Sequence, residues 1–134
     1  MAGELQFDLV SPERRLASVP ATEVQIPAMA GDMTAMAGHL PTITTLRAGI
    51  LRAATAQGVK AYVVTGGFAE VTATSVTVLA ERAVAVEEAS ATVLDEILAE
   101  AKSLAEVALP ADKALAEKNV ADVTALRDAV LLHR

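Results

Sequence analysis

Few residues in this 134-residue chain are spaced as catalytic or ligand-binding motifs require. Of the two histidines, His39 and His133, the second stands next to the C-terminus, where a fraying chain end makes a preorganised catalytic role improbable. The pair Gly66-Gly67 follows a β-type run, but the dinucleotide fingerprint would need a third glycine, and a phosphate loop would need Lys-Ser or Lys-Thr. The sequence therefore suggests no histidine-based site, and it predicts that the glycine pair is a turn or bulge between strands.

The acidic residues of the C-terminal third are spaced like a solvated helix face rather than like a pair of catalytic carboxylates. Cysteine is absent, which excludes disulfides, thiolate zinc sites and cysteine catalysis. We therefore expect no active site, no metal and no cofactor. Met29, Met33 and Met36 lie in a weakly patterned segment, where they could fill the core or form an adaptable contact surface.

Composition limits the class of protein further. Hydrophobic residues make up 53% of the chain, yet no run approaches the roughly 18 apolar residues of a membrane span. A net charge of −6 and only three aromatic residues argue against nucleic-acid binding, which needs cationic surface and stacking rings. The start of the sequence shows neither a secretory signal nor a transit peptide, so we expect a soluble protein in a cytoplasmic setting.

The chain changes character near residue 84. All seven glycines and four of the five prolines lie before this point. Residues 1–84 hold seven acidic and six basic residues, whereas residues 85–134 hold ten and five, so that most of the net charge lies in the C-terminal part. This shift predicts two modules, at 1–84 and 85–134.

The first module is predicted to be an antiparallel β-sandwich. Leu5, Phe7 and Leu9 alternate with Gln6 and Asp8, which places the apolar side chains on one face of a strand. Further short β-type runs lie at 23–26, 42–46, 49–54, 60–64, 68–72 and 75–80, separated by Gly, Pro or polar turn residues. Such close spacing is typical of a sandwich or barrel rather than of strands joined by helices.

The second module is predicted to be an α-helical hairpin. Apolar residues recur at three- and four-residue spacing over 86–108, with acidic residues between them. Leu109-Pro110 ends this pattern, because proline has no amide hydrogen to donate and disfavours a helical residue before it. A second helix is predicted over about 111–132. Both helices are rich in alanine, so we expect the pair to be only marginally stable alone.

Six blocks of the first module resemble the epsilon subunit of F-type ATP synthases, which is called delta in mitochondria. They are FDLVSPE (7–13), GD (31–32), GHLP (38–41), GILR (49–52), TGGFAEV (65–71) and VTVLAE (76–81). Their order and spacing cover nearly all of residues 5–83, and an alanine-rich hairpin follows. The resemblance implies a non-catalytic rotor subunit of the central stalk, peripheral on the cytoplasmic face of the bacterial inner membrane.

The resemblance also implies the partners. In this family the sandwich binds the gamma subunit and rests on the polar loops of the c-subunit ring, and it does not insert into the membrane. The segment 31–39 matches the family's ring-facing loop, which implies that Asp32 faces a c-subunit loop with Met33, Met36 and His39 nearby. The segment departs from the family's usual pattern at two positions, with Thr34 in place of glycine and Ala37 in place of proline.

The tail is the family's regulatory element, which can extend toward the alpha and beta subunits and block ATP hydrolysis. A Leu-Arg pair of the second helix persists as Leu126-Arg127, so the resemblance implies that Arg127 is the candidate contact to the catalytic head. Some members bind ATP through a motif whose arginine is replaced here by Ser90. The loss of that cation argues against ATP sensing.

Two other classes of function stay open on the sequence alone. A β-sandwich enzyme or ligand-binding protein would need a constellation of polar residues in the first module, and no paired candidates are present. A scaffold or adaptor unrelated to ATP synthase is compatible with an acidic helical hairpin on a β module. Partners recovered by copurification would distinguish these classes.

Overall fold

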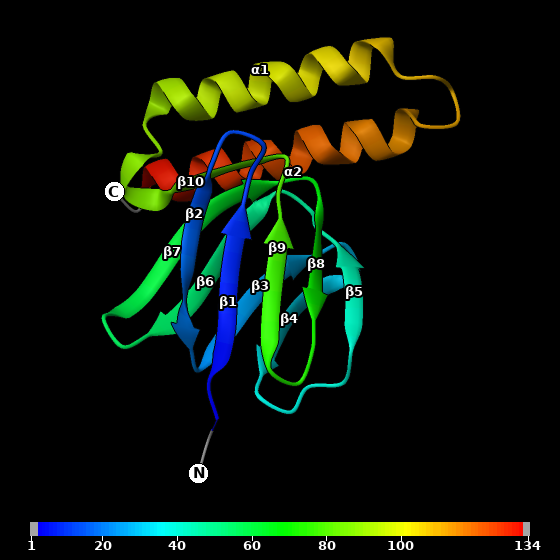
Figure 1. Cartoon of the computed structure of the whole chain (residues 1–134). Coiled ribbons are helices and arrows are strands. Elements are labelled where there is room, and N and C mark those ends of the chain that lie inside the picture. The colour runs from blue at the N-terminus through cyan, green and yellow to red at the C-terminus, as the bar shows by residue number, and fades with distance from the viewer. Residues whose placement is uncertain (1–2, 133–134) are drawn as a thin grey trace. The chain divides into compact units, whose positions relative to one another are not determined.

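The computed structural model describes residues 3–132. The chain forms two compact units, Met1–Ala85 and Val86–Arg134, the first built of strands and the second of helices (Figure 1). The strands are β1 (Leu5–Val10), β2 (Arg15–Ala21), β3 (Glu23–Ala28), β4 (Gly31–Met36), β5 (Thr42–Thr45), β6 (Gly49–Thr55), β7 (Gly58–Thr65), β8 (Phe68–Val71), β9 (Ser75–Leu79) and β10 (Arg82–Ala85). The helices are a 3₁₀ turn (Val86–Glu88), α1 (Ala91–Val107) and α2 (Lys113–Leu132).

The strands form two five-stranded sheets that lie face to face (Figure 1). The first sheet has the order β2-β1-β9-β8-β5 and the second has the order β10-β7-β6-β3-β4. All pairs are antiparallel except β1 with β9, which run parallel in the middle of the first sheet. The predicted fold class, a β-sandwich followed by two helices, is confirmed.

Alternating apolar residues from both sheets meet in one core. In β1, Leu5, Phe7 and Leu9 are fully buried, as the alternation predicts. Opposite them, the second sheet contributes Val24 and Ile26 from β3. The other residues of this core are all valine, leucine or alanine, so the sandwich depends on many contacts between small and medium-sized aliphatic side chains.

Three strands have no clear signal in the sequence. β2 contains Pro20 and several polar residues, and it pairs on one side only, with β1. Proline is tolerated in such edge strands, because an outward-facing residue there needs no ladder hydrogen bond. β4 and β10 are also edge strands. Edge strands bury fewer side chains than central strands, which weakens the hydrophobic pattern that reveals a strand.

The first helix begins later than predicted, at Ala91 rather than at residue 86. Ser90 has an extended backbone, and its side-chain oxygen accepts a hydrogen bond from the Val93 amide at 3.2 Å, which makes it the N-cap. The preceding residues form a separate 3₁₀ turn. α1 ends at Val107, two residues before Leu109-Pro110, and α2 begins at Lys113 rather than near 111.

The two helices lie side by side as an antiparallel hairpin (Figure 1). Lys113 is the first residue of α2. Its ammonium donates to the carbonyl of Ala105, in the last turn of α1, at 2.7 Å, which satisfies one of the last acceptors of that helix. The buried residues of α1 are Leu94, Ile97, Leu98, Ala101 and Ala105, and those of α2 are Val123, Leu126 and Val130. With three buried apolar side chains in 20 residues, α2 has little hydrophobic stabilisation of its own.

Truncation after Ala85 is expected to leave a folded sandwich. Both sheets are complete at β10, and the 17 residues of the sandwich core all precede Ala85. We expect a β-type circular dichroism spectrum and a single cooperative thermal transition from the truncated protein. A spectrum without β-structure, or a gradual loss of signal on heating, would show that the sandwich needs the tail to fold.

Candidate functional site

Asp32 lies at the start of β4, directly after the turn that joins it to β3. Its register partner in β3 is Pro27. The carboxylate projects from the surface, with 76% of the side chain exposed, and its Oδ1 accepts a hydrogen bond from Nη2 of Arg47. The charge of Asp32 is therefore accessible to a partner and is paired within the chain.

The segment 31–39, which was expected to be a loop, is mostly strand. β4 occupies Gly31–Met36, and only residues 37 and 38 form the turn that follows. Asp32 and Met36 are four residues apart in this strand, which corresponds to about 13 Å. The expected group of Asp32, Met36 and His39 is therefore split between the two ends of β4. The physical reason is the ladder to β3, whose hydrogen bonds extend the chain.

Met33 contributes less to the exposed surface of β4 than its neighbours do. It is partly buried and packs against the core of the sandwich, because alternate residues of a strand point to opposite faces. Its neighbours Asp32 and Thr34 are exposed. Of the two interpretations of the methionines, core packing therefore describes Met33, whereas Met36 is 55% exposed.

Met36 and His39 lie together at the far end of β4. The His39 amide donates to the Met36 carbonyl at 3.1 Å, and Gly38 takes a φ of +88° in the turn between them. The ring Nδ1 lies 2.7 Å from the Leu40 carbonyl oxygen, so a proton on Nδ1 leaves Nε2 as an acceptor. Leu40 is 78% exposed, and with Met36 it gives this end of the sandwich an apolar surface.

A second surface, which sequence reasoning missed, lies on the outer face of the first sheet. Phe68 of β8 is opposite Leu79 of β9, which is in turn opposite Val10 of β1. Ile43 of β5 lies on the same face, one diagonal step from Phe68. We call these four residues the apolar row. Ile43, Phe68 and Leu79 are 69%, 44% and 40% exposed, and contiguous exposed apolar side chains of this kind mark interaction surfaces.

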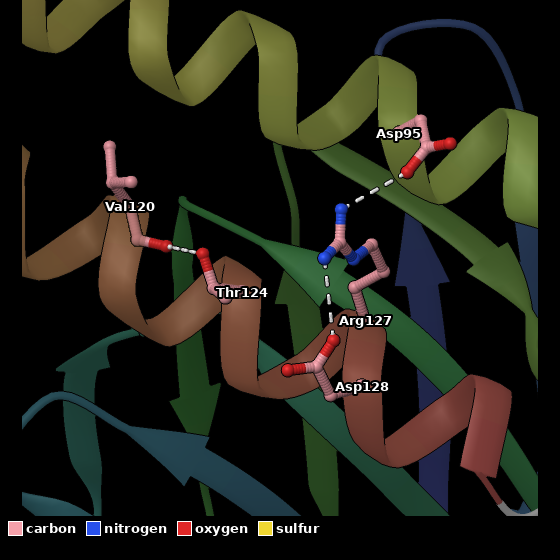
Figure 2. A network of polar contacts seen from close by, with 5 residues as sticks. All are labelled: Asp95, Val120, Thr124, Arg127 and Asp128. Carbon is pink, nitrogen blue, oxygen red and sulfur yellow. Dashed lines mark hydrogen bonds and ion pairs between the residues drawn. The ribbon is translucent and has the colours of Figure 1, made fainter.

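Arg127 binds two acidic residues of the helical unit. Figure 2 shows its guanidinium between α1 and α2, where Nη1 donates to Asp95 Oδ1 at 3.3 Å and Nη2 donates to Asp128 Oδ1 at 3.4 Å. One turn earlier, the Thr124 hydroxyl donates to the Val120 carbonyl at 2.8 Å. The structure therefore places Arg127 in a bridge between the two helices, and a contact to another subunit would have to compete with Asp95.

The remaining candidates, a metal site and a small-ligand pocket, have little support among residues 3–132. Within residues 3–132, no three His, Asp or Glu side chains are grouped so as to hold a metal ion. His133 lies outside the described residues. A depression of about 380 Å³ in the helical unit is lined by Lys102, Ala105, Glu106, Lys113, Glu117 and Val120. Lys113 in this lining already donates a hydrogen bond to the Ala105 carbonyl within the hairpin.

Neither helix between residues 3 and 132 is long and apolar enough to cross a membrane.

The glycine pair lies where the sequence predicts a turn, between β7 and β8. Gly66 and Gly67 have φ values of +65° and +90°, which side chains other than glycine rarely adopt. A Cβ on Gly67 would also collide with the Leu79 carbonyl oxygen. The turn therefore needs glycine for two separate reasons, and it sets the start of β8 and the position of Phe68 in the apolar row.

A two-sheet β-sandwich with exposed apolar and charged side chains, followed by a helical hairpin, defines the structural class of this chain. The family model described as "ATP synthase, Delta/Epsilon chain, beta-sandwich domain" matches residues 4–86. The chain belongs to the ATP synthase delta/epsilon family, which confirms the resemblance of the six sequence blocks, and the unrelated scaffold is not favoured.

Relatives from bacteria match over nearly the whole chain. The ATP synthase epsilon chain of Cereibacter sphaeroides (strain ATCC 17025) is 69% identical over 127 residues, covering 95% of this chain and 96% of the relative. The ATP synthase epsilon chain of Fuscovulum blasticum is 64% identical over 129 residues, covering 96% and 98%. The helical tail is thus included in the likeness.

Solved structures of ATP synthases contain the same fold. A chain in the Euglena gracilis mitochondrial ATP synthase, solved as OSCP, F1 and c-ring, matches with a TM-score of 0.72 at 25% identity, covering 98% of this chain and 83% of that chain. A chain in the central stalk and c-ring of the Tetrahymena thermophila mitochondrial enzyme matches with a TM-score of 0.55 at 16% identity, covering 65% and 70%. The second likeness supports the fold alone.

Proposed function

We propose that this chain is the epsilon subunit of the central stalk of a proton-translocating F-type ATP synthase, and that it passes rotation between the c-ring and the gamma subunit without an active site of its own. The observation that carries the proposal is the family match over residues 4–86, the part that forms the sandwich with its two exposed surfaces. Torque transmission needs rigid, specific contacts and no bond-making chemistry. The sandwich supplies a rigid body of two hydrogen-bonded sheets.

The apolar row is the proposed binding surface for the gamma subunit. Three of its side chains, Ile43, Phe68 and Leu79, are exposed in the isolated chain and Val10 is half-buried. Covering them would remove apolar area from water, which is the main driving force of stable association. Asp8 and Glu70 lie on the same outer face. They form part of a polar rim that would set the orientation of the bound partner.

Asp32 is the proposed contact to a polar loop of the c-ring. It lies at a turn, where the chain protrudes, and its carboxylate is accessible. Met36 and His39 lie at the other end of β4, so we propose that they contact a different part of the assembly rather than the same loop.

Paired-cysteine crosslinking tests this assignment, since the chain has no native cysteine. In assembled complexes, an Asp32→Cys variant should crosslink to a cysteine in the polar loop of the c subunit, and a His39→Cys variant should not crosslink to the same position. Assembly with normal yield but no crosslink from residue 32 at any loop position would contradict the placement of Asp32.

The two units are proposed to have different roles. The sandwich, residues 1–84, would hold the gamma subunit and the c-ring, and the hairpin, residues 85–134, would modulate ATP hydrolysis by contact with the alpha and beta subunits. In the structure Arg127 bridges to Asp95. A contact of Arg127 to the catalytic head would therefore compete with that ion pair. The complex is proposed to place the chain peripherally on the cytoplasmic face of the bacterial inner membrane.

The isolated chain is expected not to bind Mg-ATP with a dissociation constant below about 0.1 mM, which corresponds to about −5.5 kcal/mol. Ser90 stands where ATP-binding members have arginine, and its hydroxyl is engaged as the cap of α1. The neighbouring Glu87 and Glu88 would repel a polyanion. Isothermal titration calorimetry measures this directly. A Ser90→Arg variant is the matched gain-of-charge comparison, and tight binding by the unchanged chain would contradict the expectation.

A further inference from the structure

Arg47 lies in the connection between β5 and β6, and its backbone is hydrogen-bonded to the end of β3. Its backbone N–H donates to the Pro27 carbonyl at 3.0 Å. Two residues earlier, the Thr45 carbonyl accepts a hydrogen bond from the Met29 amide at 2.8 Å. These bonds hold the backbone of Arg47 at a fixed place beside the β3–β4 turn, 15 residues away from Asp32 in sequence.

Gly49 leaves the space that the Arg47 side chain uses. A Cβ at this position would lie 2.7 Å from Pro27 Cβ and 3.2 Å from Nη1 of Arg47. Both distances are shorter than ordinary contacts between such atoms, so any larger residue would displace the guanidinium or the strand end. The absence of a side chain at 49 therefore allows the guanidinium to lie against β3.

The ion pair between Arg47 and Asp32 is asymmetric in exposure. The side chain of Arg47 is 28% exposed, whereas that of Asp32 is 76% exposed. Arg47 Nη2 donates to Oδ1 of Asp32, and no residue between 3 and 132 makes a hydrogen bond to the other oxygen, Oδ2. The guanidinium thus contacts one oxygen of the carboxylate and leaves the other oxygen open to a donor from outside the chain.

We propose that Arg47 is a positioning residue that fixes the Asp32 carboxylate for binding a hydrogen-bond donor, a guanidinium, ammonium or amide group, on the polar loop of the c-ring. This inference rests on the proposed function. Orienting an exposed carboxylate in advance removes the entropy loss that its free rotation would add on binding. Arg47 also offsets the charge of Asp32, which makes the site suited to a polar loop rather than to a strongly cationic surface.

Rebinding of purified F1 to membranes stripped of F1 tests the proposal in the assembled protein. F1 is prepared with the unchanged chain, with Arg47→Gln, with Asp32→Asn, or with both substitutions. Each single substitution should weaken binding about three- to tenfold, the range for loss of one ordinary hydrogen bond. The double variant should bind as the Asp32→Asn variant does, because Arg47 acts through Asp32.

Two further variants separate positioning from general charge. Arg52→Gln removes one exposed cation from β6 and should change binding by less than about twofold. Arg47→Lys keeps the charge but loses the planar guanidinium, so its binding affinity should lie between those of the unchanged chain and the Arg47→Gln variant.

Unchanged binding of the Arg47→Gln variant, or an equal loss in the Asp32→Asn background, would overturn the positioning role. If rebinding did not require this chain at all, the proposed function would fail as well. If rebinding required the chain but showed no coupling between the two residues, only the role of Arg47 would fail.

Discussion

The Gly67→Ala substitution is expected to lower the free energy of unfolding of the sandwich by about 2 to 6 kcal/mol. A φ of +90° is unfavourable for alanine, which accounts for about 1 to 3 kcal/mol. The new Cβ would also collide with the Leu79 carbonyl, and this contact cannot relax by rotating a side chain, because it is made by backbone. Since domains are stable by only about 5 to 15 kcal/mol, the variant should unfold at a much lower denaturant concentration.

Gly58→Ala is the matched control for this prediction. Gly58 also has a positive φ, +103°, but a Cβ there would meet no atom within 4 Å. It should therefore show the backbone strain alone, about 1 to 3 kcal/mol. Denaturant unfolding of both variants, monitored by circular dichroism, measures the difference. Equal destabilisation of the two would show that the close approach of β9 to Gly67 contributes nothing.

The second large effect is expected on partner binding, from acidic substitutions in the apolar row. Ile43→Asp or Phe68→Asp should weaken binding to the gamma subunit by at least about a hundredfold, because an unpaired carboxylate would be buried in an apolar contact. Ile43 is 69% exposed, so its replacement should leave folding unchanged. Calorimetric titration of the purified gamma subunit with each variant provides the measurement.

Val59→Asp is the control for these variants. Val59 is 66% exposed at the start of β7, at the β6–β7 turn of the second sheet, and the substitution adds the same charge to a similarly exposed apolar residue. It should bind the gamma subunit like the unchanged chain. Full affinity in both Ile43→Asp and Phe68→Asp, with normal thermal unfolding, would mean that gamma binds elsewhere.

The fold class was predictable because local patterns and global architecture agree. In β1 the alternation of apolar and polar residues identifies both the strand and its buried face. The glycine pair before Phe68 predicts the turn that the positive φ values show. The missed strands lie at sheet edges. In β4 the residues 31–36 are extended by hydrogen bonds to β3, a relation between segments that the composition of β4 alone does not reveal.

The surfaces were less predictable than the fold because they combine residues from distant segments. Phe68 and Leu79 belong to one hairpin, but Val10 joins them only through the parallel pairing of β1 with β9. Arg47 lies beside Asp32 because the segment between β5 and β6 is hydrogen-bonded to the end of β3. The spacing of the two residues in the sequence does not indicate this contact. The late start of α1 had a local signal, since Ser90 is a good N-cap residue directly before the helical pattern.

Affinity purification of the tagged chain from detergent-solubilised membranes, followed by mass spectrometry, tests the central claim most directly. A central-stalk subunit should bring the gamma subunit and the c subunit with it in constant proportion, together with the alpha and beta subunits of the catalytic head. Recovery of the folded chain without the gamma subunit under mild detergent conditions would contradict the account.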